Sequence, residues 1–192
     1  MGSQLLTAPN QLTLMRLIFV PFIVINIVDG NYGWALLLFV IAGISDGLDG
    51  LLARLLKQKT VLGMYMDPIA DKMLLSTLFL VLSIEHKIQW KFTVLVFSRD
   101  IAILITSALL YAVLGFRDFR PSIFGKMNTV AQIGAVFFVL VSQLRESIWV
   151  HVTAHVLLWL VFVFTITSGL HYVILTGQRL KTHDRSRPTA AP

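Results

Sequence analysis

The sequence predicts an all-α, polytopic integral membrane protein that has six transmembrane helices. Of its 192 residues, 56% are hydrophobic and only 14% are charged, a balance far more apolar than a soluble domain of this size shows. The apolar residues also fall in blocks long enough to cross a hydrocarbon core of ~30 Å, which takes about 20 helical residues.

Six such blocks follow one another along the chain and predict helices over residues 11–29, 33–55, 67–85, 91–114, 128–145 and 151–176. We therefore expect residues 1–178 to form a single six-helix transmembrane domain. Residues 179–192 are polar and basic and include two prolines, so we expect a disordered tail near anionic headgroups. The chain has no cysteine, which excludes disulfides and thiolate metal sites.

The positive charges predict an orientation. Six spans place the N-terminus, the second and fourth loops and the C-terminal tail on one side of the membrane. That side holds Arg54, Lys57, Lys59, Arg117, Arg120, Lys126, Arg179, Lys181, Arg185 and Arg187. The other side holds only Lys87, Lys91 and Arg145, so the first side, with both termini, is expected in the cytoplasm. Interfacial aromatic residues are expected at the opposite ends of the spans, namely Tyr32, Trp34, Trp90 and Trp149.

Four aspartates lie beside or inside these apolar blocks. Asp46 and Asp49 come late in the second block, and Asp67 and Asp71 come early in the third. Residues three or four apart share one face of a helix, so each pair is expected on a single face. Two antiparallel helices joined by a short basic loop would bring the two pairs together, toward the cytoplasmic half of the membrane.

Four carboxylates at that range repel one another and cannot all stay ionised in a poorly hydrated site without cations. Lys72 or Arg54 could balance part of the charge. Two hard divalent ions, Mg²⁺ or Mn²⁺, balance it better because they take oxygen ligands. The alternative is that the aspartates are loop-proximal charges paired with nearby basic residues.

The spacing of these residues resembles a family signature. The chain contains Asp46-Gly47-Leu48-Asp49-Gly50-Leu51-Leu52-Ala53-Arg54, a gap of eight residues and Gly63-Met64-Tyr65-Met66-Asp67-Pro68-Ile69-Ala70-Asp71. This pattern resembles the signature of the CDP-alcohol phosphatidyltransferases, D-x-x-D-G-x-x-A-R…G-x-x-x-D-x-x-x-D. All eight fixed positions of that signature agree. The resemblance extends over nearly the whole chain, because the family is also built from six transmembrane helices.

The resemblance implies a reaction in which an alcohol attacks the β-phosphorus of a CDP-linked lipid, such as CDP-diacylglycerol, and CMP leaves. It implies that Asp46, Asp49 and Asp67 are metal ligands and that Asp71 is both a ligand and the general base. The nucleotide is then expected to contact Thr13, Arg16, Gly50, Ala53, Arg54 and Gly63. The family also suggests a homodimer in a bacterial inner membrane with a cytoplasmic active site, and no nucleic-acid partner.

Two branches of this family differ in the acceptor alcohol. "FSRDIAIL" (97–104) and "PSIFGKMNTVAQ" (121–132) resemble the branch that uses phosphatidylglycerol and makes cardiolipin, and we expect this acceptor. Gly125 resembles the other branch, whose acceptor is glycerol 3-phosphate and which carries lysine where this chain has Asn128. The residues expected to bind the acceptor are Arg99, Arg120, Lys126 and Asn128, although Arg99 could instead pair with Asp100 in packing.

A function of another class, an ion-coupled transporter, would also place charged residues inside a membrane. The aspartates argue against it, because they cluster at one end of the spans and do not step across the bilayer.

Overall fold

The computed structural model describes the backbone of residues 8–55, 61–114 and 123–185, and the side chains of residues 15, 17–45, 72–103, 105 and 125–170. In these residues all regular structure is helical. The helices are α1 (Ala8–Val28), α2 (Tyr32–Leu55), α3 (Val61–Ile84), α4 (Trp90–Leu114), α5 (Ile123–Leu144) and α6 (Ile148–Arg185). Each helix covers one predicted apolar block, so the all-α class and the six helices are confirmed.

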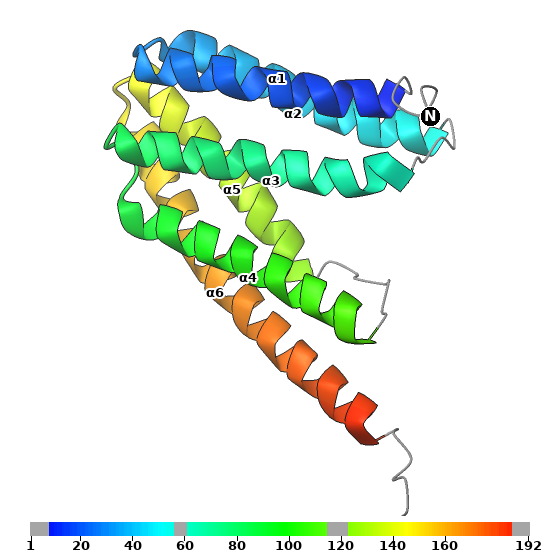
Figure 1. Ribbon diagram of the computed structural model, residues 1–192. Helices are drawn as coiled ribbons and strands as arrows, with labels where there is room; N and C mark the ends of the chain where they lie inside the picture. Colours follow the sequence, from blue (N-terminus) through cyan, green and yellow to red (C-terminus); the bar gives the residue numbers. More distant parts are fainter. Residues whose placement is uncertain (1–7, 56–60, 115–122, 186–192) are drawn as a thin grey trace, which may run out of the picture.

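The helices form two groups, α1–α3 and α4–α6. The ribbons converge at the end that holds the short turns between α1 and α2, α3 and α4, and α5 and α6, and they diverge toward the opposite end (Figure 1). Buried apolar side chains fill the converging region, among them Ile27, Phe39, Phe79, Leu82 and Leu140. Among the described side chains, the two groups therefore meet through one hydrophobic core.

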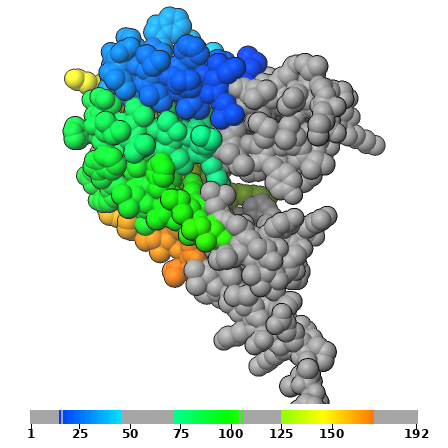
Figure 2. Space-filling model, viewed as in Figure 1, coloured from blue at the N-terminus to red at the C-terminus, as the bar shows by residue number. Residues whose placement is uncertain are grey.

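Large apolar side chains are also exposed on the outside of all six helices, and Figure 2 shows the described parts of α1, α3 and α4 side by side on one face. Val130 on α5, for example, is 70% exposed. Among the described side chains, two stretches are long and apolar enough to cross a membrane, Gly125–Leu144 and Ile148–Leu170. Shorter apolar stretches cover Leu17–Val28, Tyr32–Ser45 and Lys72–Ile84. Six membrane crossings stay a prediction.

Two of the turns at the converging end close with the same hydrogen-bond pattern. After α1, Asn31 N donates to Asn26 O at 2.8 Å and Gly30 N to Ile27 O at 3.1 Å, with Gly30 at a φ of 74°. After α3, Lys87 N donates to Leu82 O and His86 N to Ser83 O. This Schellman cap requires a left-handed residue and normally uses glycine, but in α3 it is His86 that adopts a φ of 56°.

The same end carries the exposed tryptophans Trp34, Trp90 and Trp149, as the aromatic pattern predicts. Three helix boundaries differ from the apolar blocks by five residues or more: α3 begins at Val61, α5 begins at Ile123, and α6 continues to Arg185, into the segment expected to be a tail. Good helix formers such as Gln178 and Lys181 let a helix continue past its apolar stretch.

Candidate active site

The backbone places both aspartate pairs at the diverging end of the bundle. Asp46 and Asp49 lie in the last turns of α2, and Asp67 and Asp71 lie in the first turns of α3 (Figure 1). Because each pair sits within an uninterrupted helix, its two members share one helix face. The two faces belong to neighbouring segments of the chain whose aspartate-bearing ends lie at the same end of the molecule.

Several predicted site residues fall outside the described side chains. They are the four aspartates and the expected nucleotide contacts Thr13, Arg16, Gly50, Ala53, Arg54 and Gly63, which lie on α1, α2 and α3. Arg120 lies outside the described residues altogether. Among the described side chains, no group of three or more His, Asp or Glu residues could hold a metal. The metal site therefore stays a prediction that rests on the donor chemistry of four carboxylates, whose oxygens suit Mg²⁺ and Mn²⁺.

One residue beyond Asp71, α3 enters a buried network of charges. Lys72 Nζ lies 3.6 Å from Asp100 Oδ1, and Arg99 Nη1 donates to the same oxygen at 2.6 Å. Arg99 Nη2 also donates to Ser168 Oγ on α6, at 3.2 Å. The Arg99 and Asp100 side chains are only 9% and 12% exposed. The predicted alternative for Arg99, an ion pair with Asp100, is thus present in the structure.

Asn128, at which the two branches of the family are expected to differ, belongs to α5 and faces α6. Its side chain is fully buried, and its Oδ1 accepts a hydrogen bond from Thr165 Oγ1 at 3.1 Å. Three buried donor nitrogens in this region have no hydrogen-bond partner, namely Arg99 Nε, Asn128 Nδ2 and Gln132 Nε2. The region is therefore rich in donors, a property suited to oxygen-rich groups.

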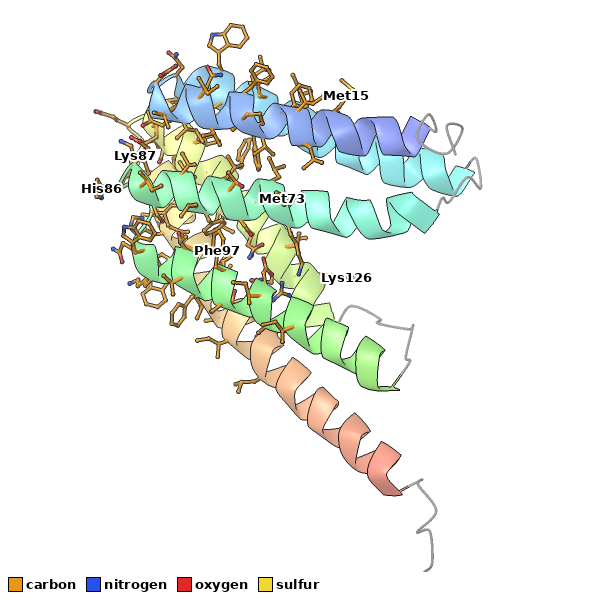
Figure 3. All side chains as sticks on the ribbon, viewed as in Figure 1. Met15, Met73, His86, Lys87, Phe97 and Lys126 are labelled. Carbon is orange, nitrogen blue, oxygen red and sulfur yellow. The ribbon has the colours of Figure 1, made fainter. Side chains whose placement is uncertain are left out.

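Lys126 differs from these residues because its side chain is exposed. It lies on the part of α5 nearer the diverging end, whereas His86 and Lys87 mark the converging end (Figure 3). The structure brings Arg99 together with Lys72, Asp100 and Ser168, and it brings Asn128 together with Thr165. Among the described side chains, Lys126 forms no hydrogen bond or ion pair with either set.

Sequence reasoning missed the two hydroxyl partners on α6. Thr165 and Ser168 are 2% and 0% exposed and lie three residues apart, so they share a helix face. That spacing was the available signal, but serine and threonine are common in apolar helices. Only the packing of α6 against α4 and α5 reveals which groups they contact.

A family model described as CDP-alcohol phosphatidyltransferase matches residues 6–167. The chain is 37% identical over 172 residues to the CDP-diacylglycerol–glycerol-3-phosphate 3-phosphatidyltransferase of Salmonella choleraesuis (strain SC-B67). The aligned region covers 86% of this chain and 92% of that protein. Proteins of the same name from Escherichia coli (strain K12) and Shigella flexneri serotype 5b are 36% identical over 171 residues, with the same coverage.

Proposed function

This chain belongs to the CDP-alcohol phosphatidyltransferase family, and we propose that it transfers a phosphatidyl group from CDP-diacylglycerol to glycerol 3-phosphate and releases CMP. The observation that carries the proposal is the similarity to relatives named for this reaction, which extends over nearly their whole length. The complete aspartate signature on α2 and α3 agrees with it.

The acceptor proposed here differs from phosphatidylglycerol, the acceptor that the sequence motifs favoured. The relatives' names support glycerol 3-phosphate. The motif argument depended on Asn128 in place of a lysine that would bind a phosphate monoester. Because the Asn128 side chain is buried and bonded to Thr165, the substitution is explained by helix packing and carries less weight as a sign of the acceptor. The cations Arg99 and Lys126 remain to bind an acceptor phosphate.

In the proposed mechanism, Asp71 takes the proton from the hydroxyl of the acceptor. The resulting oxygen forms a bond to the β-phosphorus of CDP-diacylglycerol, and the bond from that phosphorus to the CMP oxygen breaks. Asp46, Asp49, Asp67 and Asp71 would hold two Mg²⁺ or Mn²⁺ ions, which supply neutralisation of the phosphate oxygens when bound. Thr13, Arg16, Gly50, Ala53, Arg54 and Gly63 would bind and orient the nucleotide.

The proposal places all six helices across a membrane, with both termini and the aspartates on the cytoplasmic side. Three observations support it: the ten-to-three division of cations in the sequence, the exposed apolar side chains on the described helices, and the tryptophans at the end opposite the aspartates. A lipid substrate then reaches the aspartates from the bilayer and a water-soluble acceptor reaches them from the cytoplasm. A homodimer is part of the proposal on family resemblance.

The test is to incubate the purified protein with CDP-diacylglycerol, Mg²⁺ or Mn²⁺ and each acceptor in turn, and to identify the lipid product by mass. We expect CMP and phosphatidylglycerophosphate with glycerol 3-phosphate. Cardiolipin formed from phosphatidylglycerol, with glycerol 3-phosphate unused, would reverse the acceptor and keep the chemistry. No CMP with any alcohol would reject the enzyme and leave a transporter as the competing class.

A further inference from the structure

The Lys72–Asp100 ion pair links the two groups of helices. Lys72 belongs to α3 and Asp100 to α4, and both ion pairs that the described side chains form use the same oxygen, Asp100 Oδ1. Through Arg99 and Ser168 the network continues to α6. The Asp100 carboxylate thus joins α3, the helix that carries Asp67 and Asp71, to α4, and Arg99 extends the network to α6.

Burial of the Asp100 and Arg99 side chains makes the choice of ion-pair partner important for stability. A charged group that loses its partner in a buried site is strongly destabilised, and a membrane provides no water to replace that partner. Asp100 is 12% exposed and Arg99 is 9% exposed, whereas Lys72 is 31% exposed. The Lys72 ammonium therefore faces a fixed negative charge on α4, which favours one rotation of α3 about its axis.

The Lys72–Asp100 ion pair lies next to the predicted catalytic end of α3. Lys72 follows Asp71 directly, and toward the aspartate end the ribbons of α3 and α4 diverge (Figure 1). A second polar link between α3 and α4 lies nearer the converging end, where Thr93 Oγ1 donates to Phe79 O at 3.0 Å and contacts Ser83 Oγ. The Lys72–Asp100 pair is the link nearer to Asp71.

We infer that Asp100 is a positioning residue, which acts through Lys72 to fix the rotation of α3 and hence the placement of Asp67 and Asp71 opposite the acceptor-binding helices. The inference rests on the proposed function for its effect on turnover. Reacting groups must be held within a fraction of an ångström, and a misplacement of about 1 Å from a remote change can cost about 10²-fold in rate.

The test compares variants that cut one link each. Lys72→Met keeps the length of the side chain and removes the link to α3 together with one positive charge, while Lys72→Arg restores a cation. Thr93→Val is the matched control, because it cuts the other α3–α4 link, far from Asp71. We expect Lys72→Met to lower kcat by about 10- to 100-fold with the KM for CDP-diacylglycerol unchanged, Lys72→Arg to recover part of the loss, and Thr93→Val to keep its kcat. Asp100→Asn, if it folds, should lower kcat at least as much as Lys72→Met. Equal kcat values for Lys72→Met and Thr93→Val would overturn the inference.

A second measurement does not depend on turnover. The chain has no cysteine, so spin labels can be attached to cysteines introduced at Met73 on α3 and Ile101 on α4, which are 53% and 51% exposed. We expect Lys72→Met to broaden or shift the distribution of distances between the labels and Thr93→Val to leave it unchanged. An unaltered distribution in Lys72→Met would overturn the positioning role even if turnover fell, because Lys72 would then act on Asp71 by charge alone. If the wild-type protein released no CMP, the proposed function would fail while the distances still tested the link.

Discussion

Replacing Thr165 by valine tests whether Asn128 serves the packing of α5 against α6 or the binding of the acceptor. Valine has nearly the shape of threonine but no hydroxyl, so Thr165→Val removes the donor that lies 3.1 Å from Asn128 Oδ1. Both side chains are at most 2% exposed, and Asn128 Nδ2 already has no partner. In the variant, neither end of the Asn128 amide is hydrogen-bonded.

The expected cost follows from that burial. A buried polar group left without its partner typically costs about 1–3 kcal/mol, while hydrogen bonds between membrane helices average about 0.6 kcal/mol and reach about 1.7. Because the amide has no remaining partner and no exposure to water, we expect a loss near the upper membrane value, about 1.5 kcal/mol. Unfolding of the purified protein in mixed detergent micelles, titrated with a denaturing detergent, measures this loss.

Two further variants complete the experiment. Thr165→Ser keeps the hydroxyl and should retain most of the stability that Thr165→Val loses. Asn128→Leu combined with Thr165→Val removes both polar groups, and replacing both partners by apolar groups of similar shape can be nearly neutral. The packing role is refuted if Thr165→Val is as stable as Thr165→Ser. A stable double variant whose KM for glycerol 3-phosphate rises sharply would instead assign Asn128 to acceptor binding.

Three other results are expected. Chelation of divalent ions should abolish CMP release, and added Mg²⁺ or Mn²⁺ should restore it, since four carboxylates need cations to lie together; full turnover in excess chelator would exclude the metal site. Asp71→Asn should lower the rate by about 10²–10⁴-fold, because a general base is removed. In an equilibrium binding assay, it should still bind CDP-diacylglycerol better than Asp46→Asn does. Turnover near that of the wild type would show that Asp71 is not the base. His86→Gly should raise the free energy of unfolding by about 1 kcal/mol, since a left-handed residue with a Cβ costs about 1–2 kcal/mol. His86→Ala keeps the Cβ and should not raise it. Equal stability of the two variants would show that the φ of 56° carries no strain.

The sequence predicts those features of the fold that depend on local pattern. Apolar blocks predict the six helices, and the helical period predicts that Asp46 and Asp49 share a face, as do Asp67 and Asp71. The ends of the helices are less predictable, because backbone hydrogen bonding does not stop where apolar residues stop. The turn after α3 is an example, since no glycine between Ile84 and Gln89 signals the cap that His86 forms.

Contacts between distant segments could not be predicted in the same way. The sequence leaves Arg99 with two roles, acceptor binding and pairing with Asp100. It also offers no sign of the hydrogen bond to Ser168, which is 69 residues away and reaches Arg99 only through the packing of α6 on α4. Likewise, the sequence suggested Lys72 as a partial counter-charge for the four aspartates, but it contained no sign that Lys72 also lies 3.6 Å from Asp100 on α4. Such pairings depend on how each helix is rotated about its axis, which apolar periodicity specifies only coarsely.

The length of α6 has a practical consequence for handling the protein. Its 38 residues make a rod of about 57 Å at about 1.5 Å per residue, nearly twice the ~30 Å thickness of a hydrocarbon core. If α6 crosses the bilayer as proposed, its last turns form a stalk that stands clear of the lipid. A purification tag or fluorescent reporter fused to the C-terminus would then be held away from the headgroups. A fusion before Ala8 would instead enter α1 at the end where the aspartates lie, so the C-terminus is the better site for attachment.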